Sequence, residues 1–388
     1  MLAGVKPENI IYMTYYADVY SDRNPFKGMV FTDPAETTDG DWAKYGCFDH
    51  VDYTDKDVNA EVFLAILSGD AAKVTELTGK ENPKVLAATE EDTVFTFFID
   101  HGNEGVIAVG RDHVTDKQLI DALTAAHEKK IYGRWVWFME ACHSGSMFEK
   151  LPADWNIYAM TSSDAKHNAK MANCPPKDVV AGVALGTCIG SLWDQAYLEY
   201  AEQNPKTITG DLVDAVKVEV AKTSEQNVSQ YGDMAFRDMP FADFFGEVPP
   251  RRNYYRNSYN NKKDADGLVP LSEVPMHLAK WRAIRAQNDD VENAMNELKK
   301  EVAASVKREI EIMRLGSVML GEKTTDKVMK TSSSSSTYSA SCVRDLSLSL
   351  IEKCGHSLPF SESSMSVLRT ICHPSNTIPS VNWSDICI

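Results

Sequence analysis

The chain has 388 residues, of which 43% are hydrophobic and 25% charged, and these values exclude wholesale disorder. Its net charge of −16 at pH 7 argues against nucleic acid as a partner, because nucleic-acid binding needs a basic surface that displaces counterions. Since no run of eighteen apolar residues occurs, we expect no membrane span.

The first part of the chain alternates segments typical of strands with segments typical of helices. We expect strands at residues 9–16, 93–99, 134–139 and 156–160, and helices at residues 58–67, 115–129, 193–202 and 212–222. The runs TVFTFFI and RWVWFM are almost unbroken apolar stretches, as in parallel strands covered on both faces. This order predicts an α/β fold with an open, mostly parallel sheet and flanking helices.

The second part of the chain has a different character. A stretch rich in Pro, Arg, Asn and Tyr interrupts the pattern at about residues 248–268. Helical spacing then continues over residues 289–319, and a serine run at residues 332–336 leads into a cysteine-bearing tail. We therefore divide the chain into a first domain at 1–247, a linker at 248–288 and an all-α domain at 289–388.

The charge is divided unevenly between these parts. Residues 1–247 contain 21 Lys and Arg against 40 Asp and Glu, whereas residues 248–388 contain 19 against 16. Opposite net charges favour docking of the second part on the first. Composition is equally compatible with a simpler interpretation, in which only the first part is an acidic domain.

Four cysteines lie in the tail, at Cys342, Cys354, Cys372 and Cys387. In an oxidising compartment they predict two disulfides, with three connectivities open. Zinc is the weaker alternative because the spacing lacks closely paired ligands. We predict neither a metal nor a cofactor. Two Asn-X-Ser sequences, at Asn227 and Asn382, have the form of glycan acceptors.

The first residues contain no signal peptide, which taken alone indicates a cytoplasmic protein. Together with the tail cysteines, the same observation instead suggests that the sequence is incomplete at its start. On that interpretation we expect secretion, or a lysosomal or vacuolar location.

The candidate catalytic residues follow two of the expected strands. Asp100, His101 and Gly102 come directly after the first apolar run, and the segment Glu140-Ala141-Cys142-His143-Ser144-Gly145 ends the second. Parallel strands deliver their carboxyl ends to one edge of a sheet, so His101 and Cys142 should meet there. A thiolate is a nucleophile, and imidazole is the base that forms it.

Each of these residues also has a structural interpretation, because a single His or Cys at a strand end is often just part of the core. Their matched positions favour catalysis over that reading. His143 is the less suitable base, since successive strand side chains point to opposite faces.

The motif F-x-D-H-G, followed about forty residues later by E-A-C-x-S-G-S-M-F, resembles the legumain (asparaginyl endopeptidase) family of caspase-like cysteine peptidases. The likeness extends to residues 15–25, 52–54, 63–70 and 230–232, and the tail resembles that family's C-terminal prodomain. The resemblance therefore implies a caspase-like sheet followed by a helical prodomain, with proteins and peptides as substrates.

The resemblance also implies a role for each site residue. Cys142 is the nucleophile, His101 its base, and the backbone amides of Gly102 and Cys142 form the oxyanion hole. Asp100 lies beside the catalytic His, Glu140 forms a wall of the substrate pocket, and Thr187 falls at the pocket floor, where the family has Asp. Asn288 is the candidate for self-cleavage, with Asn293 and Asn296 as competing sites. The tail disulfides become Cys342–Cys372 and Cys354–Cys387, and the prodomain inhibits the peptidase until acidification.

The same likeness shows departures from the family. The sequence starts at the family's second strand, so we expect an N-terminally incomplete domain whose sheet lacks a central strand and exposes an edge. Thr187, and Asn168 near the family's pocket Ser, make a preference for Asn less secure than the peptide cleavage itself.

Three functions compete. The first is a cysteine endopeptidase zymogen that cleaves after Asn, or after Asp at lower pH, with a peptide-ligase side activity that uses the same residues. The second is an inactive relative that binds proteins. The third, disfavoured by the four tail cysteines and the lack of a membrane segment, is a subunit of the transamidase that attaches lipid anchors.

Overall fold

The structure, a computed structural model, describes residues 5–15, 20–34, 51–246, 267–288, 290–332, 337–378 and 380–388. Cys47, linker residues 248–266 and part of the serine run lie outside these residues. None of the helices in the described part is long and apolar enough to cross a membrane.

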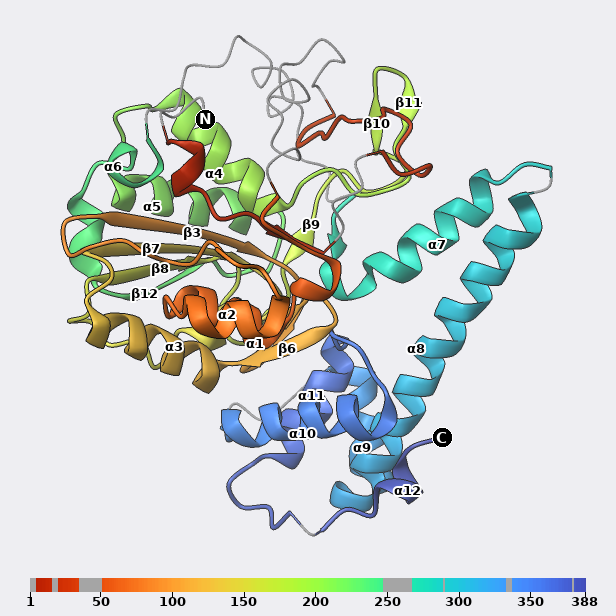
Figure 1. Ribbon diagram of the computed structural model, residues 1–388. Coiled ribbons are helices and arrows are strands. Elements are labelled where there is room, and N and C mark those ends of the chain that lie inside the picture. Colours follow the sequence, from red (N-terminus) through yellow and green to blue (C-terminus); the bar gives the residue numbers. More distant parts are fainter. Residues whose placement is uncertain are drawn as a thin grey trace.

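A four-stranded sheet lies at the centre of the first domain, in the order β12-β8-β7-β3 (Figure 1). Three of its strands, β3, β7 and β8, are parallel, and the edge strand β12 is antiparallel. The mostly parallel sheet predicted from the apolar runs is therefore confirmed. The bounds of the sheet strands are β3 Thr93–Ile99, β7 Arg134–Glu140, β8 Ile157–Thr161 and β12 Ser229–Gly232.

Helices cover both faces of this sheet, as the continuous apolar strands require. Trp135, Trp137 and Met139 of β7 pack into one core with helices α1 and α3. Val136 and Phe138 point to the other face, where they pack with α4 and α5. The helices of this domain are α1 Ala60–Leu67, α2 Ala71–Thr78, α3 Asp116–Lys129, α4 Leu192–Gln203, α5 Thr209–Ala221 and α6 Ala242–Phe245.

Smaller sheets surround the central one. A three-stranded antiparallel sheet, β4-β5-β6, follows β3 directly, and a two-stranded parallel pair, β1-β2, lies in the N-terminal region. Among the described residues, β3 is bonded to β7 alone, and its Phe97 and Ile99 are 43% and 51% exposed. These strands are β1 Met13–Thr14, β2 Tyr53–Thr54, β4 Gly102–Asn103, β5 Val106–Val109 and β6 Asp112–Thr115.

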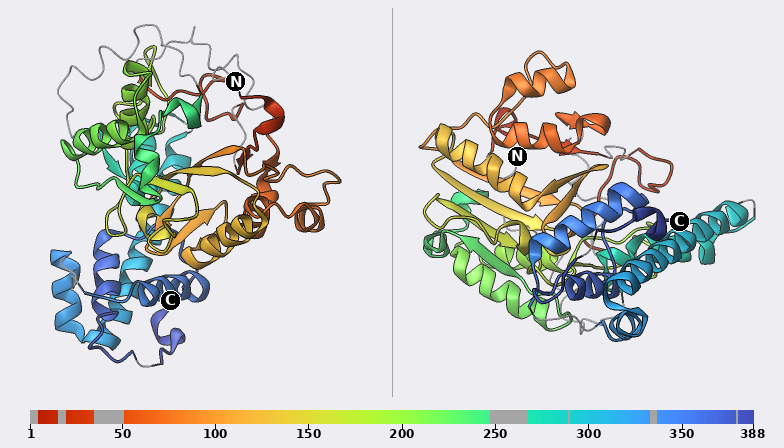
Figure 2. Two further views of the ribbon diagram at one scale, coloured as in Figure 1. Left: turned by 90° about the vertical axis from the view of Figure 1, so that its left-hand side faces the viewer. Right: turned by 90° about the horizontal axis from the view of Figure 1, so that it is seen from below.

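The C-terminal part is helical, as the spacing predicted, and it has a core of its own. Figures 1 and 2 show it lying against the end of the central sheet from which β4 continues. Its helices are α7 Val274–Arg285, α8 Asp290–Leu320, α9 Glu322–Thr331, α10 Ala340–Cys354, α11 Glu362–Ile371 and α12 Trp383–Ile386. Of these, α7 lies within the segment expected as a linker.

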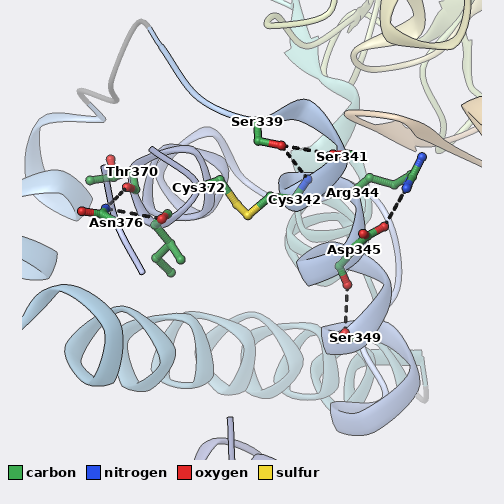
Figure 3. The surroundings of a disulfide bond; sticks show 10 residues. Ser339, Ser341, Cys342, Arg344, Asp345, Ser349, Thr370, Cys372 and Asn376 are labelled. Atoms are coloured by element: carbon green, nitrogen blue, oxygen red, sulfur yellow. Dashed lines mark hydrogen bonds and ion pairs between the residues drawn. A yellow bond between two sulfur atoms is a disulfide. The ribbon is translucent and has the colours of Figure 1, made fainter. Parts of the chain in front are cut away.

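Two disulfides stabilise the helical part. Cys342 on α10 is bonded to Cys372 after α11 (Figure 3), and Cys354 is bonded to Cys387. These are the pairs that the family resemblance implies. A third disulfide, Cys174–Cys188, closes a loop in the first domain and was not expected. Cys142 is the free cysteine of the described residues.

Candidate active site

The register of β3 and β7 brings the two candidate catalytic residues together. Ile99 pairs with Glu140 in parallel register, and the Asp100 N–H donates to the Glu140 carbonyl over 3.3 Å. His101 and Cys142 lie two residues beyond that pair on their respective chains, at the same edge of the sheet. The backbones touch one residue later, where a Cβ built on Gly102 would lie 2.5 Å from the Cys142 carbonyl oxygen.

This close approach makes Gly102 a sensitive position. We expect Gly102→Ala to push the two strand ends apart and to lower the free energy of unfolding by about 1–3 kcal/mol, because the obstacle is backbone that cannot rotate away. Urea unfolding of this variant beside the wild-type chain tests this, and equal stabilities would contradict the close contact.

His101 is half-buried, two residues beyond the end of β3. Burial lowers the pKa of its imidazole, and its Nδ1 is buried with no hydrogen-bond partner among the described residues. Its carbonyl accepts the Ala108 N–H over 2.8 Å, which fixes its backbone to β5. A neutral imidazole can accept a proton from a thiol, as a general base requires.

Cys142 is completely buried in this closed form. Burial raises the pKa of its thiol to about 12, although the backbone N–H groups of Ala169 and Ser272 face the sulfur and oppose that shift. Leu271 and Ala169 pack against it. The thiol therefore stays protonated and covered while the segment around Leu271 is in place.

The two acidic candidates have different environments. Asp100 accepts the N–H groups of His101, over 2.7 Å, and of Gly110, over 3.3 Å, and burial raises its pKa to about 6. Glu140 is fully buried, and that burial, reinforced by Asp194, raises its pKa to about 8. Both carboxyl groups therefore carry a proton at acidic pH.

Sequence reasoning missed the partner of Glu140. Ser191, the N-cap of α4, donates its hydroxyl to Glu140 Oε2 over 2.7 Å, while Oε1 is buried without a partner. The capping pattern Ser191-x-x-Asp194 marks the start of α4, but its position beneath β7 depends on the tertiary fold. Thr187 is instead exposed, in the disulfide-closed loop, and lines a cavity beside α7 and α8.

The structure places the remaining candidates at the surface. Asn288 is exposed in the turn between α7 and α8, with a left-handed φ of 52°. The glycan candidates are also exposed: Asn227 donates to Asp164 over 2.9 Å, and Asn382 is the N-cap residue of α12.

A segment of the expected linker lies along the site. Strand β13 (Val269–Pro270) pairs antiparallel with β9 (Lys170–Met171), and the Leu271 N–H donates to the Ala169 carbonyl over 2.9 Å. The chain then turns into a 3-10 helix, in which the Leu271 carbonyl accepts the Val274 N–H. The chain is thus extended at Val269–Pro270, and the 3-10 helix that follows begins at Leu271, which packs against Cys142.

Helices α10 and α11 cover the other side of this edge. Arg369 of α11, 3% exposed, forms ion pairs with Glu104, just after β4, and with Glu362, and donates to the Lys166 carbonyl over 2.9 Å. Nearby, the Phe360 N–H donates to Asn103 Oδ1 over 3.0 Å, and Arg344 of α10 binds Asp116 at 2.7 Å. Acidic groups of the first domain thus pair with arginines of the helical part.

An imidazole and a thiol thus follow neighbouring parallel strands of an open α/β sheet. The chain belongs to the Peptidase C13 family, whose profile matches residues 1–247.

Three relatives are each 29% identical to the chain: a hemoglobinase from Schistosoma japonicum, a vacuolar-processing enzyme delta-isozyme from Arabidopsis thaliana and a legumain from Mus musculus. The matches cover 74%, 70% and 76% of this chain and 62%, 58% and 62% of the relatives. The matched region thus spans less than two thirds of their lengths. Among solved structures, caspase-1 from Spodoptera frugiperda matches with 14% identity and a TM-score of 0.30, over 47% of this chain and 71% of that chain.

Proposed function

We propose that the protein is a cysteine endopeptidase that is held inactive by its own C-terminal part. The main observation is that strand β13 is paired with β9 as an extended peptide substrate would be, and leads into Leu271, which packs against Cys142. The names of the relatives, hemoglobinase and vacuolar-processing enzyme, support proteins as substrates and an acidic compartment such as a vacuole or lysosome.

The chemistry follows from the residues at the strand ends. His101 takes the proton of the Cys142 thiol, and the thiolate attacks the carbonyl carbon of the scissile bond. The N–H groups of Gly102 and Cys142 stabilise the negative oxygen that forms. His101 then protonates the leaving amine, and water releases the acyl group from the enzyme. Where an amine replaces water in that last step, the product is a new peptide bond.

Glu140 supports a preference for Asn at the cleaved position. Because its pKa is about 8, this buried carboxyl is neutral in an acidic compartment. A neutral acid can both donate to and accept from a side-chain amide, and its Oε1 is still unpartnered. A substrate Asp, when protonated, resembles Asn in shape and charge, so cleavage after Asp requires a lower pH.

The inhibited state is supported by how β13 ends. A substrate must present its carbonyl to the oxyanion amides, but the Leu271 carbonyl is taken by the Val274 N–H. Strand β13 and the Leu271 that follows it, which we call the inhibitory strand, thus lie beside Cys142 without presenting a reactive carbonyl. The ion pairs of Arg369 and Arg344 add a second contact, between the helical part and the same edge of the site.

Acid release should depend on His143, which is fully buried next to this contact. Its Nδ1 lies 3.1 Å from the Ala165 carbonyl, its Nε2 has no partner in the described residues, and Asp164 and His167 lie nearby. Burial and the Arg369 guanidinium lower its pKa to about 3. If docking lowers the pKa of His143, protonation of His143 opposes docking. Docking then weakens as the pH falls below the pKa that His143 has in the undocked state, which is about 6.5 for an ordinary His.

Protonation of the neighbouring carboxylates does not weaken docking at mildly acidic pH. Burial outweighs Arg369 and raises the pKa of Glu104, so its protonation does not oppose docking. Burial by itself would raise the pKa of Asp116, but Lys150 and Arg344 outweigh it and lower this pKa. The Asp116 carboxylate therefore stops stabilising the docked state only below pH 3.8.

We therefore expect docking to weaken by about tenfold per pH unit below pH 6.5, and His143→Gln to remove most of this dependence. Hydrogen exchange of residues 102–106 in the full chain, compared between variants at each pH, measures the opening. Lys353→Gln is the control, on the exposed side of α10. An unchanged pH profile in His143→Gln would contradict this role.

An inactive, protein-binding relative is the second candidate, and the unpartnered Nδ1 of His101 favours it, because a catalytic imidazole is usually oriented through that atom. A thiol-reactive peptide probe ending in Asn, applied at pH 5–6 to the opened protein, separates the two functions. A peptidase is labelled at Cys142, whereas an inactive relative is not labelled.

A further inference from the structure

The loop closed by the Cys174–Cys188 disulfide follows directly on β9, the strand that lines the groove. It contains a short hairpin, β10 (Val179–Val180) and β11 (Val183–Ala184). Asp178 is the one acidic residue in the loop sequence, and its side chain is completely buried.

Asp178 is bound by a single cation. Its two carboxylate oxygens accept from the Arg285 guanidinium over 2.7 and 2.8 Å, and its Oδ2 also accepts the Gly186 N–H over 2.7 Å. Arg285 lies at the end of α7, with its guanidinium 5.3 Å from the Trp281 ring. The Arg285 hydrogen bonds outweigh burial and lower the pKa of Asp178, so the group is a carboxylate.

The direction of the inhibitory strand shows where this carboxylate lies relative to a substrate. The Gly267 carbonyl accepts the Cys174 N–H over 3.1 Å, whereas Leu271, four residues later, lies over Cys142. A peptide running the same way therefore has its N-terminal residues beside the disulfide-closed loop. Helix α7 folds back over the same loop, with His277 Nε2 at 2.7 Å from the Pro175 carbonyl.

We propose that Asp178 is a specificity-determining residue that binds an Arg or Lys side chain of the substrate, at the place where Arg285 sits in the closed form. This inference rests on the proposed peptidase function. Counted back from Leu271 to Gly267, which lies beside Cys174, the basic residue is about five or more positions before the cleaved bond.

The physical reason is that opening leaves an oriented carboxylate behind. When α7 leaves, Asp178 loses its cation, whereas the Gly186 N–H and the disulfide belong to the first domain and stay in place. Of the other cations that line the adjacent cavity, Arg282, which is bound to Glu297 of α8, and Lys300 leave with the helical part. Arg23 of the first domain stays, but it is an exposed side chain that lies 3.8 Å from Glu297 in the closed form. A guanidinium suits such a carboxylate because it donates two parallel hydrogen bonds.

The test is a peptide series in which a single Arg is moved through positions four to seven before the cleaved Asn. We expect kcat/KM for the best Arg peptide to exceed that of its Gln counterpart about five- to tenfold, and the ratio to fall in high salt. Asp178→Asn, which keeps an acceptor for the Gly186 N–H, should bring the ratio close to one. Asp121→Asn, on exposed α3, is the matched control and should keep the ratio.

A binding measurement separates this inference from the proposed function. Fluorescence anisotropy of labelled Arg and Gln peptides on the opened Cys142→Ala chain gives the same comparison without turnover. A preference for the Arg peptide that is lost in Asp178→Asn supports the binding site, whether or not any peptide is cleaved. If no peptide is cleaved, the proposed peptidase function fails while the binding site stands. Equal binding of the two peptides, or a preference that survives Asp178→Asn, overturns the inference.

Discussion

Replacing Cys142 with Ala should abolish peptide cleavage by the opened protein, with a loss of about a thousandfold or more in kcat. The reason is chemical: no other thiol among the described residues is free, and Ala cannot form the acyl intermediate. His101→Gln should cause a loss of similar size, because without the imidazole the thiol has no base. Cleavage of a fluorogenic peptide containing Asn, followed at pH 5.5, measures both effects.

The control for His101 is His113→Gln, a change of the same kind on β6, whose histidine lies outside the site. We expect that variant to retain the wild-type rate. Both site variants should unfold at the wild-type temperature, which separates loss of chemistry from loss of fold. Residual cleavage near the wild-type level in Cys142→Ala would show that the thiol is not the nucleophile.

Reversing the charge of Arg369 should separate the helical part from the first domain at neutral pH. In Arg369→Glu, the new carboxylate would be buried against Glu104 and Glu362, so the contact that now joins the two parts becomes repulsive. Breaking a buried ion pair costs about 3–5 kcal/mol, which corresponds to a loss of about 10² to 10⁴ in the docking equilibrium constant. We expect peptide cleavage at pH 7, where the wild-type chain is silent.

Lys353→Glu is the matched control for this change, because Lys353 is an exposed residue of α10. It should leave the chain closed at pH 7. If Arg369→Glu folds normally, as shown by circular dichroism, and stays inactive at neutral pH, then the helical part does not inhibit through this contact. The strand over Cys142 would then account for inhibition by itself.

Much of the fold could be predicted from single segments of sequence. The apolar runs at residues 93–99 and 134–139 gave the neighbouring parallel strands, and the motifs after them gave His101 and Cys142, because strand direction alone determines which ends meet. The long helix over residues 290–320 was likewise readable from its spacing. These features depend on local pattern.

Other features depend on contacts between residues far apart in the chain, which no local pattern indicates. The Cys174–Cys188 disulfide exists because Ala172 forms backbone hydrogen bonds with Ile189 and Gly190, which brings the two cysteines together. Ser191 reaches Glu140 for a similar reason, since α4 starts beneath β7. Helix α7 was missed because we read the Pro-rich stretch before it as the beginning of a longer linker.

The hydrogen bond between the Val274 N–H and the Leu271 carbonyl has a consequence for the fate of the chain itself. A peptide that continued straight past Cys142 would expose that carbonyl to the sulfur, whereas the actual chain coils at this residue. We infer that the protein keeps the peptide bond after Leu271 intact in two ways: the coil withholds the carbonyl, and a leucine stands where the proposed pocket prefers Asn.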